Sequence, residues 1–423
     1  MDDLTKVHFG GRWWRNEDDA MEHSWGIGTF IVRFRRSSKL VMRMKSAYSG
    51  VYYTCQIDGG REVKLLHDNS VEYFEVASGL VSTEEHTVRC GRNNEASWGS
   101  TIIYDLNLDT GGEILQADDP NADNTMLRFE AIGDSITAGF KVTSNSAYDP
   151  LTIENQDVFQ TYIRFMADAF GTSDYNVVAK TGVTMLDYAQ TEVSMPLEWS
   201  CRQFWNKWQV SCPSLWDFSS WQADVVTINL GTNDFFHGNP TQQQFREGYL
   251  SLIQDVRTKY PHALIACIEP IQHSCSIENN DVKLNIIEGI VDGLEQAVND
   301  MSDPKVIYYR TENRNNQWLD CTANTTDFVD FIHPTVRGNK KIAARLIETM
   351  REDVRRFFPE KCGGSGILCK AALQSSTTAP ERLPSLSFTS TATAINIFLP
   401  VLFLFSSVVC RCRLRRGGRS RQT

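Results

Sequence analysis

Short apolar segments alternate with longer amphipathic segments from residue 127 onward, and this alternation restricts the fold more than any other feature of the chain. The apolar segments have the length of strands: Leu127 to Ile132, Asn176 to Ala179, Asp224 to Leu230, Ala263 to Ile268 and Lys305 to Tyr309. The segments between them carry apolar residues every three or four positions, which is typical of helices that pack on a sheet: Val158 to Phe170, Gln242 to Tyr260, Val282 to Val298 and Gly338 to Phe357. This order predicts an α/β domain with a parallel sheet and a site at the carboxyl ends of its strands.

The first part of the chain has a different pattern of apolar and polar residues. From Val7 to about Leu115, short alternating runs such as Thr29 to Phe34 are separated by Gly and polar turns. This pattern predicts an all-β sandwich domain over residues 1–120, ahead of the α/β domain at residues 121–362.

The C-terminal part, residues 363–423, fits neither the α/β pattern nor the all-β pattern. Residues 363–393 are rich in Ser, Thr and Pro and predict a stalk, and residues 394–410 are apolar and uncharged. A basic tail follows at residues 411–423, so we expect a transmembrane helix with a cytosolic end; a signal removed during lipid anchoring stays open as the alternative.

This topology predicts that everything before the basic tail lies outside the cytosol, anchored to a membrane on the extracellular or lumenal side. The chain begins MDDLTKVHFGG, which does not resemble a secretory signal, so we expect the start of the gene model to be missing; a tail-anchored protein is the alternative. The sequon at Asn324 agrees with the secretory route.

Cysteine content and net charge indicate which disulfides and which binding partners to expect. The chain has 11 cysteines, and close spacing suggests local disulfides between Cys201 and Cys212, Cys267 and Cys275, and Cys362 and Cys369, with scattered buried thiols as the alternative. Cys55, Cys90 and Cys321 stay open to other partners. The net charge of -10 argues against a nucleic-acid partner, no ligand-spaced metal site emerges, and we expect a monomer without a cofactor.

A serine nucleophile and its base are suggested by two segments. The first predicted strand runs into Gly133-Asp134-Ser135, which places Ser135 in the turn that leaves the strand. Asp330 precedes His333 by three residues, so its carboxylate can reach Nδ1 while Nε2 faces the serine.

Acyl transfer also needs hydrogen-bond donors for an oxyanion. Gly182 and Asn233 each follow a predicted strand, and together with the Ser135 amide they are the candidate donors. Asp134 and Asp234 are expected to organise loops rather than to take part in the chemistry.

These segments together resemble a known family. GDSIT at 133–137, the glycine at 182, GTND at 231–234 and DFIHP at 330–334 match, in order, the four blocks of SGNH (GDSL-type) hydrolases. The resemblance implies a three-layer α/β/α fold, with Ser135 as nucleophile, His333 and Asp330 completing a triad, and Ser135, Gly182 and Asn233 forming the oxyanion hole.

A second resemblance is to carbohydrate esterase family 2, in which a jelly-roll domain precedes the hydrolase domain. The stretches that carry it are Gly11-Arg12, Gly28 to Phe34, Tyr52 to Gly59, and Trp216 to Trp221 ahead of INLGTND. That resemblance implies a serine esterase that removes O-acetyl groups from xylan- or glucomannan-type carbohydrate through an acetyl-serine intermediate. A lipid ester hydrolase and a non-catalytic glycan-binding protein remain alternatives. Five tryptophans between Trp199 and Trp221, and Trp318, are candidates for stacking on sugar rings, with packing against the β domain as the alternative for the five.

Overall fold

The computed structural model describes residues 3–46, 50–186, 215–271, 281–311, 318–320 and 322–362, all within one compact unit that spans residues 1–375. Within these ranges no helix combines the length and the hydropathy needed to cross a membrane. The predicted stalk, membrane span and basic tail lie outside the described residues.

The N-terminal region is a β-sandwich, as predicted. One sheet has the order β1-β4-β9-β6-β7 with β11 paired to β4, the other has the order β2-β3-β10-β5-β8, and the paired strands are antiparallel. The strands are β1 (His8–Gly10), β2 (Trp14–Arg15), β3 (Met21–His23), β4 (Thr29–Arg35), β5 (Leu40–Ser46), β6 (Gly50–Ile57), β7 (Val63–Asp68), β8 (Tyr73–Ala77), β9 (Glu85–Arg92), β10 (Thr101–Asn107) and β11 (Glu113–Leu115). Two 3-10 turns, η1 (Asp3–Lys6) and η2 (Ala96–Trp98), complete the domain.

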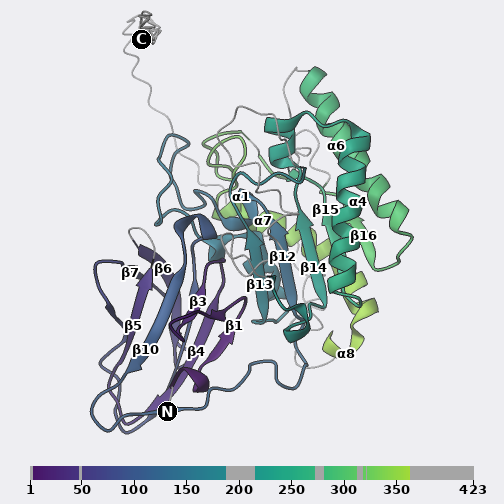
Figure 1. Ribbon diagram of the computed structural model, residues 1–423. Coiled ribbons are helices and arrows are strands. Elements are labelled where there is room, and N and C mark those ends of the chain that lie inside the picture. Colours follow the sequence, from purple (N-terminus) through teal and green to yellow (C-terminus); the bar gives the residue numbers. More distant parts are fainter. Residues whose placement is uncertain are drawn as a thin grey trace, which may run out of the picture. The chain divides into compact units, whose positions relative to one another are not determined.

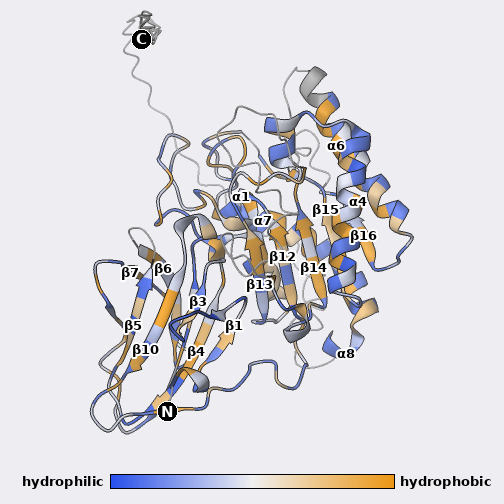
Figure 2. Ribbon diagram, viewed as in Figure 1, coloured by the Kyte–Doolittle hydropathy of each residue, from blue (hydrophilic) through white to orange (hydrophobic). Residues whose placement is uncertain are grey.

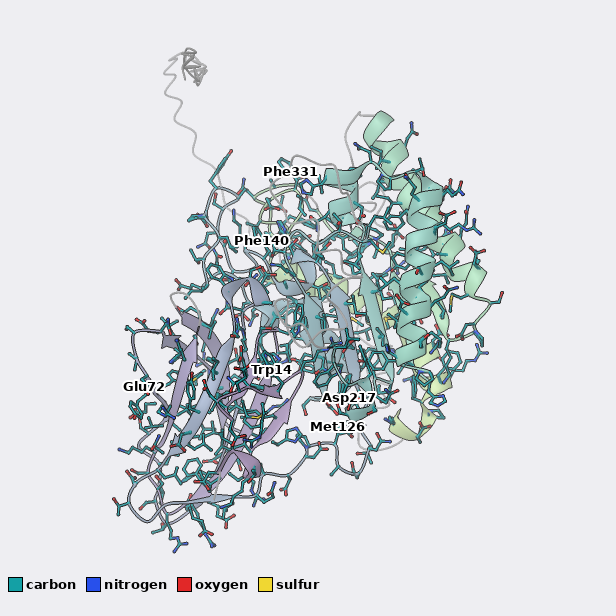
Figure 3. The ribbon with its side chains drawn as sticks, viewed as in Figure 1. Trp14, Glu72, Met126, Phe140, Asp217 and Phe331 are labelled. Atoms are coloured by element: carbon teal, nitrogen blue, oxygen red, sulfur yellow. A yellow bond between two sulfur atoms is a disulfide. The ribbon has the colours of Figure 1, made fainter. Side chains whose placement is uncertain are left out.

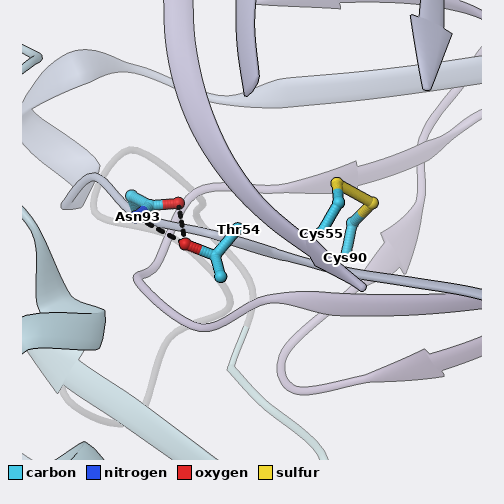
Figure 4. The surroundings of a disulfide bond; sticks show 4 residues. All are labelled: Thr54, Cys55, Cys90 and Asn93. Carbon is cyan, nitrogen blue, oxygen red and sulfur yellow. Dashed lines mark hydrogen bonds between the residues drawn. A yellow bond between two sulfur atoms is a disulfide. The ribbon is translucent and has the colours of Figure 1, made fainter. Parts of the chain in front are cut away.

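A disulfide joins two neighbouring strands of this sandwich. Cys55 on β6 lies directly opposite Cys90 on β9, and the two sulfurs are bonded (Figure 4). The expected pairing of Cys267 with Cys275 is wrong, because Cys267 is a free thiol buried in the core on a central strand of the α/β domain. Cys201 and Cys212 lie outside the described residues, as does Cys369, so the pairings expected for them stay predictions.

The α/β domain is built on a five-stranded sheet of order β13-β12-β14-β15-β16, in which all neighbouring strands are parallel. Its strands confirm the five predicted segments: β12 (Phe129–Gly133), β13 (Tyr175–Ala179), β14 (Val225–Asn229), β15 (Leu264–Ile268) and β16 (Val306–Tyr309). The chain leaves β12 for β13 on one side and returns to β14 on the other. The carboxyl end of β12 is therefore the topological switch point, where α/β sheets place their ligands.

Helices cover both faces of this sheet and make three layers (Figure 1). On one face, α2 (Tyr162–Ala169) and α7 (Val336–Phe357) pack through residues such as Met166 and Leu346. On the other face, α4 (Gln242–Lys259) and α6 (Asp281–Met301) pack through residues such as Leu252 and Leu294. Figure 2 shows the central strands mostly in orange and α6 in both orange and blue, as expected for a buried sheet under amphipathic helices.

Shorter helical segments connect these layers. They are α1 (Ser135–Ala138), η3 (Val158–Gln160), η5 (Phe218–Ser220), η6 (Asp234–Gly238) and α8 (Pro359–Cys362).

The predicted helix from Val158 to Phe170 is interrupted. The 3-10 turn η3 ends at Gln160. The next residue, Thr161, is extended, with a φ of -96° and a ψ of 166°, and α2 begins only at Tyr162. The Tyr162 amide donates to Oδ1 of Asn339 on α7, at 3.0 Å. A tertiary contact thus satisfies a backbone donor at the start of α2 and fixes where the helix begins.

Candidate active site

Ser135 occupies the first position of α1, directly after β12. Its side chain is buried, with 3% exposure for the residue. The turn is tight: a Cβ on Gly133 would lie 2.1 Å from Oγ1 of Thr137, so only glycine fits there. Asp134 caps α1 by accepting a hydrogen bond from the Ile136 amide at 3.0 Å, which is the loop-organising role expected for it.

His333 faces Ser135 across the carboxyl end of the sheet. Its Nε2 lies 2.9 Å from the serine Oγ. The histidine stands in the loop before α7, where the Val329 amide donates to the His333 carbonyl at 2.9 Å and Phe328 pairs with Pro334. The backbone of this loop therefore holds the ring within hydrogen-bond reach of the serine hydroxyl.

Asp330 holds the other side of the histidine ring. Oδ2 of Asp330 lies 2.9 Å from Nδ1 of His333, and Oδ1 accepts from the amides of Ile332 at 2.8 Å and His333 at 2.7 Å. Burial opposes ionisation of this carboxyl, but the bonds from the His333 ring and from the two amides outweigh it and lower the pKa of Asp330 to about 2. An ionised carboxylate at Nδ1 keeps the proton on that nitrogen and leaves Nε2 free to accept one from the serine.

The two candidate oxyanion donors outside the serine turn lie beside each other. Gly133, at the end of β12, is in register with Ala179 of β13 and Asn229 of β14, so the loops after all three strands meet. Nδ2 of Asn233 donates to the Val183 carbonyl at 2.8 Å, which ties it to the residue after Gly182. Since that amide nitrogen carries two protons, one remains for an oxyanion.

The conformation of the Gly182 loop depends on Gly182 itself and on Asp234. Gly182 has a φ of +81°, a conformation in which glycine is favoured. Both carboxylate oxygens of Asp234 accept from backbone amides, those of Met185 at 2.8 Å and Leu186 at 3.0 Å. Asp234 therefore organises the Gly182 loop, as the sequence predicts.

Phe140 is a site residue that the sequence analysis did not find. The ring of Phe140, labelled in Figure 3, packs against the His333 ring with 4.3 Å between centroids. Its amide donates to the Ser135 carbonyl at 2.9 Å. Phe140 lies outside the motif blocks, five residues after the serine, and no periodic pattern marks it. It covers one face of the histidine ring.

The described tryptophans mostly pack within the fold. The Trp221 indole donates to Oδ1 of Asp174 at 2.9 Å, and the Arg12 guanidinium of the β-sandwich lies 5.7 Å from the Trp216 ring. These contacts favour the packing alternative for these two residues. Trp199, Trp205 and Trp208 lie outside the described residues.

Trp318 packs against the hydrophobic core, and its indole donates to the Thr311 carbonyl at 3.1 Å. Its contact with substrate stays a prediction. In the part of the chain that the structure describes, no group of three or more His, Cys, Asp or Glu side chains is arranged to hold a metal ion.

The fold and this constellation define a class. Residues 129–346 match the family model of the GDSL-like lipases and acylhydrolases, and residues 9–117 match that of the carbohydrate esterase 2 N-terminal domain. The chain belongs to the GDSL-like lipase/acylhydrolase family, a family of ester hydrolases, and carries the carbohydrate esterase 2 type of domain in front of the hydrolase.

One curated protein is similar to this chain over most of the chain's length. The chain is 26% identical over 351 residues to cellulase/esterase CelE of Acetivibrio thermocellus, an alignment that covers 82% of this chain and 39% of that protein. The chain therefore spans well under two thirds of this curated relative.

Two solved structures share the fold. A family two carbohydrate esterase from Clostridium thermocellum in complex with cellohexaose superposes with a TM-score of 0.68 at 21% identity, covering 82% of this chain and 99% of that one. The acetyl xylan esterase Est2A from the rumen bacterium Butyrivibrio proteoclasticus superposes with a TM-score of 0.63 at 17% identity, covering 82% and 96%.

Proposed function

We propose that this chain is a serine esterase that removes O-acetyl groups from carbohydrate through an acetyl-serine intermediate. The observation that carries the proposal is the chain of contacts from Asp330 through His333 to the Ser135 hydroxyl. The family to which the chain belongs supports ester hydrolysis, and the names of its relatives support a carbohydrate acetate as the substrate class.

The geometry gives each residue a step. Nε2 of His333 takes the Ser135 proton as Oγ attacks the acetyl carbonyl, and Asp330 stabilises the resulting imidazolium. The carbonyl oxygen becomes an oxyanion, which accepts hydrogen bonds from the Ser135 and Gly182 amides and from the Asn233 side chain. The imidazolium then protonates the departing sugar oxygen.

Hydrolysis of the acetyl-serine intermediate repeats these steps with water as the nucleophile. His333 deprotonates the water, which attacks the acetyl-serine carbonyl, and the same donors stabilise the second oxyanion. Collapse releases acetate, and His333 returns the proton to Ser135 Oγ. Each cycle therefore converts one ester and one water into a sugar hydroxyl and acetic acid.

We also propose that the catalytic part works outside the cytosol. The Cys55–Cys90 bond supports this, because such bonds persist in oxidising compartments. Proteolysis of intact cells that removes the esterase from their surface is the expected result, and protection until the cells are lysed would contradict it.

The decisive assay compares acyl groups on one preparation. Acetate release from acetylated xylan and acetylated glucomannan is measured beside hydrolysis of long-chain esters, with Ser135→Ala protein as the blank. We expect acetate release that Ser135→Ala abolishes, and an acetyl-enzyme adduct on the peptide that contains Ser135 when the reaction is quenched in acid.

Two results would contradict the proposal. Acetate release that persists in the Ser135→Ala protein would exclude the acetyl-serine route. A preference for long-chain over acetyl esters would assign the chain to lipid hydrolysis instead.

A further inference from the structure

The loop between β9 and β10, residues 93–100, connects the β-sandwich domain to the hydrolase domain through hydrogen bonds. Nδ2 of Asn93 donates to Oδ1 of Asp157 at 2.7 Å, and Nδ2 of Asn94 donates to the carbonyls of Ile153 at 2.8 Å and Gln156 at 3.0 Å. Asn93 is also hydrogen bonded to Thr54, next to the Cys55–Cys90 disulfide (Figure 4). The start of the β9–β10 loop is therefore bonded to both the sandwich and the hydrolase domain.

Glu95 of this loop reaches the oxyanion segment. Its Oε2 accepts a hydrogen bond from the Thr181 amide at 2.6 Å, and the residue is only 2% exposed. Thr181 immediately precedes Gly182. Lys180, one residue earlier, donates through Nζ to Oγ of Ser97 at 2.6 Å, so the β9–β10 loop contacts two consecutive residues before the glycine.

The main chain at Glu95 is held by several hydrogen bonds. The Arg92 guanidinium, with 1% exposure, donates to the carbonyls of Asn94 at 2.9 Å and Glu95 at 3.2 Å, and the Glu95 amide donates to Oε1 of Gln156 at 3.2 Å. A carboxylate that is buried on a fixed main chain has little room to move, so its bond can impose an orientation on the Thr181 amide.

That orientation matters because the residue after Thr181 is a glycine. A glycine at φ +81° imposes little conformational preference of its own, so neighbouring contacts decide where its amide points. A hydrogen bond to a carboxylate is roughly twice as strong as one between neutral groups, and low polarity around a buried bond strengthens it further. Glu95 supplies such a bond one peptide unit away from the Gly182 amide.

We propose that Glu95 is a positioning residue of the esterase site: its carboxylate fixes the Thr181 amide and thereby aims the Gly182 amide at the oxyanion. This inference rests on the proposed function. It makes the β-sandwich domain a structural part of the oxyanion hole, so the hydrolase domain alone has an incomplete catalytic site.

The test separates transition-state stabilisation from folding and substrate binding. In the full chain, Glu95→Ala and Glu95→Asp remove or withdraw the acceptor, whereas Glu95→Gln keeps a carbonyl oxygen of the same reach. Each variant is assayed for kcat and KM on an acetyl ester and for the Kd of a boronic acid, which forms a tetrahedral anion on Ser135. The Kd of the deacetylated oligosaccharide is measured in parallel.

We expect Glu95→Ala and Glu95→Asp to lower kcat and weaken boronic acid binding by about 10- to 100-fold, somewhat less than the loss of a direct oxyanion donor. KM and the oligosaccharide Kd should change less than twofold, and Glu95→Gln should restore most of the loss. Partial unfolding would weaken boronic acid and oligosaccharide binding by the same factor, so it cannot imitate a loss that is confined to the boronic acid.

Lys64→Ala is the matched control. Lys64 lies on β7 and also contacts the hydrolase domain, donating to Oδ2 of Asp157 and to the Glu154 carbonyl, both at 2.9 Å, but it does not contact the Gly182 loop. Its kcat and boronic acid affinity should equal those of the wild type.

Three results would overturn the inference. Wild-type kcat and boronic acid affinity in Glu95→Ala would exclude a positioning role while leaving the proposed function intact. Equal weakening of boronic acid and oligosaccharide binding would indicate a general structural role. A wild-type chain that hydrolyses no acetyl ester would refute the proposed function, and the inference with it.

Discussion

Asp134, the residue before Ser135, bonds the main chain of the turn through its carboxyl group. The residue is fully buried, and one of its oxygens accepts from the Ile136 amide. Burial, reinforced by the nearby Asp234 carboxylate, raises the pKa of Asp134 from 3.8 to about 7. Its protonation state therefore differs between the folded and unfolded chain across a wide range of pH.

This shift predicts a pH-dependent stability. Between about pH 4 and pH 7 the unfolded chain has lost the Asp134 proton while the folded chain retains it, so raising the pH through this window favours unfolding. Asp134→Asn keeps the acceptor but cannot ionise. We expect the difference in unfolding free energy, wild type minus Asp134→Asn, to fall by up to about 1.4 kcal/mol per pH unit in this window and to level off above it.

Urea denaturation of both proteins from pH 4 to 8 measures that difference. The pH window lies between 3.8, the ordinary pKa of the Asp134 carboxyl, and about 7, its pKa in the folded chain. Parallel stability curves over the whole range would show that Asp134 is ionised in the folded state.

At the scale of elements, the candidate nucleophile and the candidate oxyanion donors lie in the loops after three adjacent parallel strands. The loop after β12 supplies Ser135, the loop after β13 supplies Gly182, and the loop after β14 supplies Asn233. Hydrogen bonds link these segments: the Lys180 amide donates to the Gly133 carbonyl at 3.3 Å, and Nδ2 of Asn233 donates to the Val183 carbonyl at 2.8 Å. The position of each candidate donor thus depends on the register of the sheet.

Removal of one of these donors should affect turnover more than binding. Asn233→Ala is expected to lower kcat on an acetyl ester by about 100- to 1,000-fold with little change in KM, because the donor acts on charge that develops only in the transition state. Asn299→Ala, on the exposed side of α6, is the control and should leave both constants unchanged. A rise in KM with unchanged kcat would instead assign Asn233 to substrate binding.

At the scale of the whole described unit, a buried ion pair joins the two domains. Nη2 of Arg12, in the β-sandwich, donates to Oε1 of Glu130 on β12 at 2.8 Å, and both side chains are 0% exposed. The Tyr260 hydroxyl donates to the other oxygen of Glu130 at 3.0 Å. The Arg12 guanidinium also lies 5.3 Å from the centre of the Phe218 ring.

Breaking this pair should be costly. Arg12→Met leaves the Glu130 charge buried without its counter-ion, and we expect a loss of about 3–5 kcal/mol in unfolding free energy. Adding Glu130→Gln should recover part of the loss, because the amide is neutral and still accepts from Tyr260. Chemical denaturation measures both.

The exposed pair between Arg15 and Asp19 provides the comparison. Arg15→Met should cost no more than about 1 kcal/mol, as is usual for solvent-exposed ion pairs. If Arg12→Met were as mild as Arg15→Met, the interdomain pair would contribute little to stability.

Much of this architecture is local enough to be predicted from the sequence. The period of the apolar residues determined the strands and helices of the α/β domain and the β-rich character of the first domain. The order of the motif blocks determined which strand ends carry Ser135, Gly182 and Asn233, because parallel strands place their carboxyl ends at one edge. The three-residue spacing of Asp330 and His333 determined that these side chains can meet.

Only the tertiary structure decided the contacts between segments that are distant in the chain. Cys55 pairs with Cys90 and Cys267 stays free because strand pairing and core packing, not sequence proximity, decide which sulfurs meet. The start of α2 depends on Asn339 of α7. The contact of Glu95 with Thr181 spans two domains, and no local pattern encodes it. The sequence by itself thus determined the elements and the candidate reactive groups, and packing between domains decided how those groups are held.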